Sequence, residues 1–107
     1  MRFEIVLAPT AVKELRSLRA DVRARVRDAI ELHLRHEPRR LSKSRIKRLR
    51  RLDRPQYRLR VDEVRVFYDV TKASVEILAI VSKEQAQAWL NEEATPSSSS
   101  GSGPGKG

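Results

Sequence analysis

The sequence predicts one domain of the α+β class, and two changes in hydrophobic period along the chain carry this prediction. Apolar residues first alternate with their neighbours, then recur at helical spacing, and from Gln56 onward alternate again. The chain has 107 residues, which is enough for one hydrophobic core and too few for two. We therefore expect a single domain over residues 1–93, with an N-terminal strand, a helical hairpin, an antiparallel β-meander and a short C-terminal helix.

A strand and a helix are expected first. Phe3, Ile5 and Leu7 alternate with their neighbours, as in a strand with one buried face. Pro9-Thr10 then ends the strand and opens a helix. Apolar side chains recur along this helix at Val12, Leu15 and Leu18.

A second helix is expected after a short turn at Arg19-Ala20, with Asp21 as its capping residue. The two helices should form an antiparallel pair, and Pro38 should end the second one. His33 and His36 have a spacing that a metal site could use, but no cysteine or carboxylate supports one. We interpret His33 as a packed core residue and expect no metal or other cofactor. The apolar face of the second helix comprises Val22, Val26, Ala29, Ile30 and His33.

Positive charge is concentrated in residues 38–54. The whole chain has 23 Lys and Arg against 14 Asp and Glu, and this segment alone holds nine basic residues and one acidic residue. Such a field attracts phosphate backbones, anionic membranes or acidic proteins. The alternative is a solvated loop that aids solubility. Its spacing of three between Ile46, Leu49 and Leu52 predicts a helical turn. The residues that we interpret as RNA-binding here are Arg45, Lys47, Arg48 and Arg50.

A β-hairpin is the most informative feature of the second half. After Gln56, the residues of the stretch YRLRV alternate between apolar and basic, and Asp62-Glu63 then forms a two-residue turn. Further strands are expected over 64–70 and 75–81, followed by a helix over 83–91. A two-residue turn fixes the register, and the expected pairs are Val61–Val64, Arg60–Arg65, Leu59–Val66, Arg58–Phe67 and Tyr57–Tyr68.

This register gathers Arg58, Arg60, Arg65 and Phe67 on one sheet face and leaves the other face for the core. Like charges directly opposite are unfavourable by part of the ~0.2–1 kcal/mol typical of cross-strand pairs, and a bound anion would relieve this. Phe67 supplies a ring on which a base could stack. The alternative is a solvated face with splayed arginines, or one neutralised by Asp69 and Glu76.

The remaining features concern the C-terminal tail and the cellular compartment. Residues 94–107 are mainly Ser, Gly and Pro, which predicts a disordered tail. The chain has no cysteine, so disulfides and thiolate metal sites are excluded. The apolar run at the start contains Glu4 and is too short to span a membrane, so we expect a cytoplasmic protein that does not bind membranes.

The stretch KRLRRLDRPQYRLRVDEVRVFYDVTKASVEILAIVSKEQAQAW resembles the second half of RelE/ParE superfamily toxins of type II toxin-antitoxin systems, closer to the RelE side. The family string is a Tyr-Arg-hydrophobic-Arg strand, a turn and an Arg-Val-hydrophobic-Tyr strand, and YRLR and RVFY stand for it here. The resemblance covers the layout of residues 2–91 and is most specific over 47–81. It implies a RelE-like fold, a toxin function and a small cognate antitoxin as partner.

RelE-like members are ribosome-dependent endoribonucleases that cut messenger RNA without a metal, by attack of a ribose 2′-hydroxyl on the neighbouring phosphorus. The resemblance implies that Arg65 stabilises the phosphate and that Arg58 and Arg60 orient the RNA, so these three are the predicted catalytic residues. Fixed guanidinium groups suit the doubly charged phosphorane. The implied target is mRNA on the ribosome.

The chain departs from the RelE pattern after the last strand, where those enzymes carry a further basic residue and then a Tyr or His. Lys83 is the candidate for the extra RNA-binding cation and Trp89 for the stacking ring, but neither is a good general acid. Glu84, Tyr57 and Tyr68 are other possible proton carriers, so the acid and base stay unassigned. The alternative functions are a ParE-like toxin that binds DNA gyrase without nuclease activity, and a non-catalytic nucleic-acid-binding member of the family.

Overall fold

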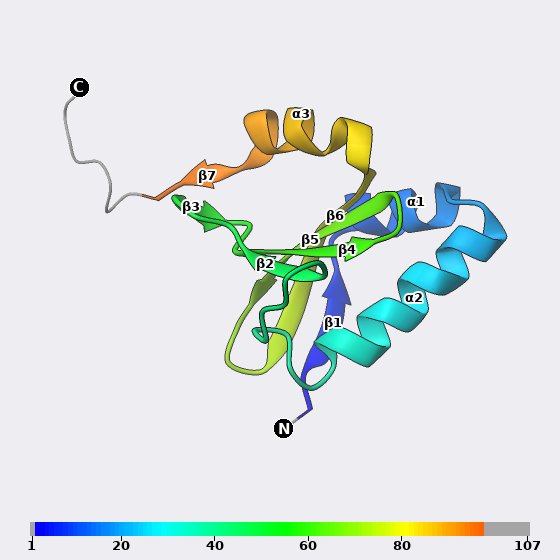
Figure 1. Ribbon diagram of the computed structural model, residues 1–107, viewed down its shortest axis with the longest axis horizontal. Coiled ribbons are helices and arrows are strands. Elements are labelled where there is room, and N and C mark those ends of the chain that lie inside the picture. The colour runs from blue at the N-terminus through cyan, green and yellow to red at the C-terminus, as the bar shows by residue number, and fades with distance from the viewer. Residues whose placement is uncertain (1, 98–107) are drawn as a thin grey trace.

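The computed structural model describes residues 2–97 and contains a five-stranded sheet with helices on both faces (Figure 1). The strand order is β1-β6-β5-β4-β2, with β1 parallel to β6 and the other neighbours antiparallel. This arrangement confirms the predicted α+β class and the order of its elements. The strands are β1 (Glu4–Leu7), β2 (Ile46–Arg48), β4 (Tyr57–Val61), β5 (Val64–Val70) and β6 (Ser74–Ser82).

Two helices, α1 (Pro9–Ser17) and α2 (Ala20–Leu34), follow β1 and pack on the core face of the sheet. Pro9 stands at the start of α1, where its missing N–H is not needed. The capping prediction for Asp21 is wrong, because this residue lies in the first turn of α2 and its carboxylate accepts from the Arg19 guanidinium at 3.0 Å.

The end of α2 also differs from the prediction, since the helix stops at Leu34 and not at Pro38. Arg35 explains the earlier end. Its carbonyl accepts from the backbone N–H of Phe3 at 2.7 Å, and its guanidinium donates to the carbonyl of Phe3 at 3.0 Å. These bonds draw the chain away from the helix axis and toward the start of β1.

The β4–β5 hairpin has the predicted register, and all five expected cross-strand pairs are present. Asp62, the first residue of the turn, has a φ of 52°. Aspartate tolerates this left-handed conformation better than branched residues do, which makes the two-residue turn possible. The predicted strands and the last helix are confirmed, with β6 and α3 (Lys83–Glu93) each slightly longer than expected.

The core lies between the sheet and the first two helices. Leu59, Val66 and Tyr68 of the hairpin are fully buried there against Val26 and Leu34 of α2. The Tyr68 hydroxyl donates a 2.7 Å hydrogen bond to the carbonyl of Pro38, and its ring stacks on that of Tyr57 with centroids 5.4 Å apart. Pro38 therefore fixes the start of the basic segment to the core.

The opposite sheet face is covered in part by α3, which lies above the strands in Figure 1. The Trp89 ring stacks on Phe67 with centroids 5.0 Å apart and planes 7° from parallel. No residue of α3 is fully buried, and its partly buried residues within the helix include Ala86, Trp89 and Leu90. Trp89 therefore anchors the last helix on the sheet.

The helical turn predicted in the basic segment is wrong. Residues Ile46–Arg48 form β2, the edge strand next to β4, and Leu52–Arg54 form β3. Arg51 has a φ of 64°, which reverses the chain between these strands and is incompatible with a right-handed helix. The spacing of three is not helical, because only Ile46 reaches the core, while Leu49 lies in the connection and Leu52 begins β3, both only partly buried.

The C-terminal segment is ordered further than the sequence predicts. Thr95–Pro96 form β7, which pairs with β3, and the backbone N–H of Ser97 donates to the carbonyl of Arg51 at 2.9 Å. The rest of the predicted tail lies outside the described residues. In the part of the chain that is described, every helix is too short or too polar to cross a membrane.

The two stacked tyrosines allow a matched test of the core. Tyr68→Phe should lower the free energy of unfolding by roughly 1–2 kcal/mol, because it leaves the buried Pro38 carbonyl without its donor. Tyr57→Phe is the control, since the Tyr57 hydroxyl makes no hydrogen bond within residues 2–97 and should change little. Urea unfolding of both variants is the measurement. Equal losses would mean that the Tyr68 hydroxyl contributes nothing specific.

Candidate functional site

The arginine face is the sheet surface that carries Arg58 and Arg60 of β4 and Arg65 of β5. Arg60 lies directly opposite Arg65, and Arg58 lies opposite Phe67. No ion pair within residues 2–97 involves any of the three arginines. The face is therefore a cluster of cations without counter-charges.

Arg58 has the least favourable electrostatic environment of the three arginines. Its side chain is partly buried, and its Nε is buried without a hydrogen-bond partner. Burial first, and then the charges of Arg65 and Arg60, lower the pKa of the Arg58 guanidinium. A buried, unpaired donor on a cation is costly to maintain, so an anion placed beside Arg58 would be strongly favoured.

Arg65 and Arg60 differ in how their guanidinium groups are held. Arg65 Nη1 donates to the carbonyls of Asp62 at 2.8 Å and Val64 at 3.1 Å, which ties the group to the hairpin turn. The Arg60 side chain is exposed, and no hydrogen bond restrains its guanidinium within residues 2–97. Arg65 thus has fewer donors left for a ligand than Arg60 has.

Lys47 joins this surface, a position that the sequence did not reveal. It lies on β2 directly opposite Arg58, so its side chain leaves the sheet on the same face. The expected helical turn hid this neighbour, because only a strand at 46–48 pairs Lys47 with Arg58.

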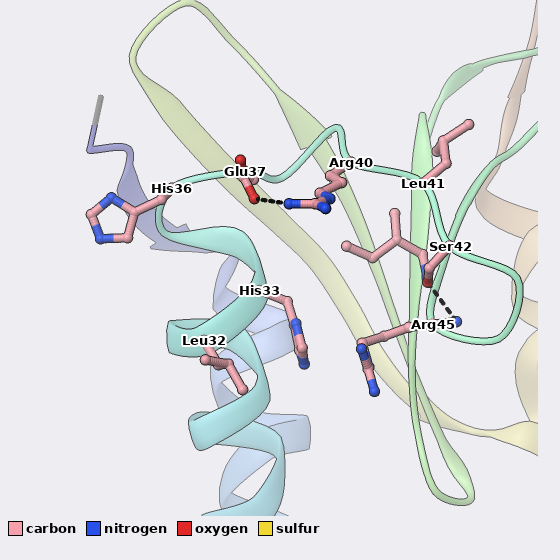
Figure 2. Close-up of a pocket in the computed structure, with 9 residues that line it drawn as sticks. Leu32, His33, His36, Glu37, Arg40, Leu41, Ser42 and Arg45 are labelled. Atoms are coloured by element: carbon pink, nitrogen blue, oxygen red, sulfur yellow. Dashed lines mark hydrogen bonds and ion pairs between the residues drawn. The ribbon is translucent and has the colours of Figure 1, made fainter.

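The other predicted RNA-binding residues of the basic segment lie away from the arginine face or contact other parts of the chain. Arg48 Nη1 donates to the carbonyls of Leu49 and Gln56 at 2.9 and 2.8 Å, and its guanidinium lies 5.4 Å from the Tyr57 ring centroid. These contacts brace the β2–β3 connection. Arg50 is exposed at this connection, and Arg45 precedes β2 and turns its side chain toward α2 (Figure 2).

Two residues that were predicted to contact nucleic acid contact other residues of the protein instead. The Phe67 side chain is only 1% exposed beneath Trp89, so the expectation that it stacks on a base is wrong for this conformation. Lys83 begins α3 and forms an ion pair with Glu63 at 3.5 Å. Trp89 is half-buried, so part of its indole remains accessible next to the arginine face.

Of the two acids considered as neutralising partners, Glu76 forms no ion pair within residues 2–97, and Asp69 has other bonds. The Asp69 carboxylate accepts from the backbone N–H of Gln56 at 2.7 Å and pairs with Arg54 at 3.5 Å. Burial raises the pKa of this carboxyl, although the Gln56 N–H and Arg54 partly oppose the shift. Asp69 therefore anchors the chain before β4 and leaves the arginine face positively charged.

The face offers no pair of side chains arranged for proton transfer. Tyr57 and Tyr68 lie on the core face, as expected, and burial together with Tyr57 raises the pKa of Tyr68 further above its ordinary value. Glu84 is exposed in the first turn of α3. Lys47, which the sequence named as an RNA-binding residue, lies opposite Arg58 and has a proton to donate.

His33 is not the packed core residue that the sequence suggested. Its side chain is only partly buried and lines two cavities that it shares with Arg45. Burial first, and then Arg45, lower the pKa of His33. Figure 2 shows His33 and His36 pointing in different directions, and residues 2–97 contain no cluster of three potential metal ligands.

The sequence matches a family model described as the ParE toxin of the type II toxin-antitoxin system parDE, over residues 5–87. The chain belongs to this family. No curated protein matches the sequence of the toxin.

Solved structures resemble the toxin in fold. The RelE-RelB complex of the archaeon Pyrococcus horikoshii contains a chain with a TM-score of 0.64 and 24% identity, which covers 78% of this chain and 97% of that one. A chain of the RelB-RelE complex of Methanococcus jannaschii gives 0.60 and 21%, covering 78% and 96%. A chain of the RelBE2 complex of Mycobacterium tuberculosis gives 0.62 and 22%, covering 77% and 99%. The family model confirms the predicted RelE/ParE superfamily, and these structures confirm the predicted fold.

The buried, unpaired Nε of Arg58 leads to a prediction about the stability of the toxin. Arg58→Met removes a buried, unpaired donor and one like charge, so the variant should be at least as stable as the wild type. Arg60→Met is the matched control, because it removes an exposed charge from the same face. Urea midpoints should rise more for Arg58→Met. A lower midpoint for this variant would show that Arg58 already has a stabilising partner.

The lowered pKa of His33 leads to a prediction of how the stability of the toxin depends on pH. Its folded-state pKa lies below the ordinary value near 6.5, so the unfolded chain binds the proton more readily. Stability should therefore be lost as pH falls through that value toward the folded-state pKa. Unfolding midpoints measured from pH 7.5 to 5 should fall less steeply for His33→Gln, and Arg45→Gln should flatten the curve in part. Parallel curves for wild type and His33→Gln would contradict this cause.

Proposed function

We propose that this toxin is a ribosome-dependent, metal-independent mRNA endoribonuclease whose arginine face holds the phosphate that is cut. The observation that carries the proposal is Arg58, a partly buried cation whose Nε has no partner and which lies among Arg60, Arg65 and Lys47. A phosphate supplies the negative charge and the acceptor oxygens that this cluster lacks.

The reaction fits the groups on the face. A ribose 2′-hydroxyl attacks the adjacent phosphorus and loses its proton, while the bond to the 5′-oxygen breaks and that oxygen gains a proton. The products are a 2′,3′-cyclic phosphate and a free 5′-hydroxyl. Arg58 and Arg60 would stabilise the charge that develops on the non-bridging oxygens, and Lys47 is positioned to protonate the leaving oxygen.

The ribosome supplies what the toxin lacks. No group on the arginine face is arranged as a base for the 2′-hydroxyl, and Arg65 is partly engaged by its own turn. Positioning of the hydroxyl in line with the scissile bond contributes up to ~7–11 kcal/mol in favourable cases. Free RNA, which is not held in this way, should be a poor substrate.

The second candidate function is a ParE-like toxin that binds DNA gyrase. Two observations favour it: the family model carries the ParE description, and no complete acid–base pair lies on the arginine face. On this alternative the same cations would bind a protein or DNA surface without any bond being broken. Either function needs a cognate antitoxin in the same cell, and the three similar solved structures are toxin-antitoxin complexes.

The two functions are separated by running two assays on one preparation. Primer extension on a message translated in vitro, with and without ribosomes, should show cuts only with ribosomes, and gyrase supercoiling should be unaffected. Arg58→Met should lower the cleavage rate by about 10²–10³, as for loss of one transition-state donor.

Arg27→Gln is the control for general basicity, because it removes one exposed charge from α2 away from the arginine face. It should keep full activity. An intact message with blocked supercoiling would overturn the nuclease proposal in favour of gyrase, and a fully active, folded Arg58→Met would overturn the assignment of the site.

A further inference from the structure

Two cavities beside α2 share His33 and Arg45. One, of about 440 Å³, opens between the end of α2 and the start of β2. The other, of about 390 Å³, lies between α2 and the end of β4, where Arg60 and Asp62 line it. We call the two together the His33–Arg45 cleft. Each is within the size range of sites for small ligands, which is about 300–1,000 Å³.

The cleft has uncompensated positive charge because its carboxylates are already engaged. Glu37 pairs with Arg40 at 2.9 Å, and Asp62 pairs with Arg25 at 2.9 Å. Arg45 and Arg60 form no ion pair within residues 2–97.

The side chains in the cleft converge from two walls. Figure 2 shows His33 extending from α2 and Arg45 extending from the opposite wall toward it, while Arg40 turns to Glu37. The proximity of these two groups has an electrostatic consequence, since Arg45 contributes to the lowered pKa of His33. The cleft therefore holds a guanidinium and an imidazole that face each other.

Ser42 adds a hydroxyl donor to this set. Its Oγ accepts from the backbone N–H groups of Arg45 and Ile46, each at 3.0 Å, so its own proton is free to be donated. A guanidinium, an imidazole and a hydroxyl that converge on one space can bind the several oxygens of a phosphate group.

We propose that the His33–Arg45 cleft is a phosphate-binding site, distinct from the arginine face. Arg60 lies on both surfaces, so one RNA strand can place one phosphate on the arginine face and a neighbouring phosphate in the cleft. This choice of occupant rests on the proposed function. A small free phosphate compound is the other source of the same chemistry.

The first experiment follows the imidazole signals of the full chain by NMR while inorganic phosphate is added, against sodium chloride at equal ionic strength. Phosphate should shift the His33 signals and raise the pH midpoint of its titration, because a bound anion favours the imidazolium. The other titratable and charged residues that line the cavities are His36, Glu37, Arg40 and Arg45 in the first and Arg45, Arg60 and Asp62 in the second.

Two variants locate the response. Arg45→Gln should raise the half-saturating phosphate concentration roughly ten-fold, as for loss of a charged hydrogen bond. Arg27→Gln, which removes a charge from α2 but lines neither cavity, should leave it unchanged. His33 signals that respond no more to phosphate than to chloride would overturn the site, and so would an equal effect of both variants.

The second experiment identifies the occupant with a short single-stranded RNA. RNA should displace phosphate from His33, and Arg45→Gln should flatten the slope of log affinity against log salt by about 0.7. If RNA binds without disturbing His33, the cleft remains a phosphate site but the RNA occupant is overturned. If phosphate shifts His33 and RNA does not bind at all, the RNA occupant is overturned while the cleft stands as a phosphate site, and the primer-extension assay with ribosomes tests the nuclease function separately.

Discussion

The two-residue turn at Asp62-Glu63 is the constraint on which the rest of this structure depends. The left-handed conformation of Asp62 closes the hairpin without a bulge, and this fixes every pair between β4 and β5. A slip of one residue would place Tyr57 and Leu59 in solvent and the arginines in the core. Burial of Leu59, Val66 and Tyr68 therefore selects the register, and the register in turn gathers the arginines on the other face.

The same register creates an electrostatic cost that the fold does not remove. Arg60 and Arg65 stand opposite each other, and Arg58 keeps a buried Nε without a partner. Asp69, the nearest acid along β5, is committed to Gln56 and Arg54. A hydrophobic residue at position 58 would be easier to accommodate, and the arginine that stands there is the observation on which the proposed phosphate site rests.

The hairpin, its register and the final helix could be predicted because their signals are local. The alternation of side chains specifies the strands of the hairpin, and the two-residue turn specifies their register. The return of apolar residues, Trp89 among them, to helical spacing specifies the final helix. None of these signals needs knowledge of the rest of the chain. The position of Lys47 could not be found in this way. Its strand is three residues long and exists because β4 offers an edge to pair with, while its own spacing favours a helix.

Long-range contacts explain the other differences. Burial of Phe67 depends on Trp89, which is distant in sequence and reaches it only because α3 returns over the sheet. The end of α2 depends on Arg35 and Phe3 at opposite ends of the N-terminal half. His33 has the spacing of a core residue, and only the course of residues 38–45 leaves an open cleft beside it. None of these outcomes has a signature in a short window of sequence.

The fold alone does not decide between cleavage and binding, because one fold can carry different functions and the difference lies in a few side chains. In this toxin α3 already covers the Phe67 part of the sheet, so the accessible cations lie toward the hairpin and β2. A target must therefore approach from that side. There Arg60 connects the arginine face to the His33–Arg45 cleft, and a ligand with regularly spaced negative charges can engage both. A nucleic-acid backbone has this property, whereas a folded protein meets it only with acidic groups at matching positions.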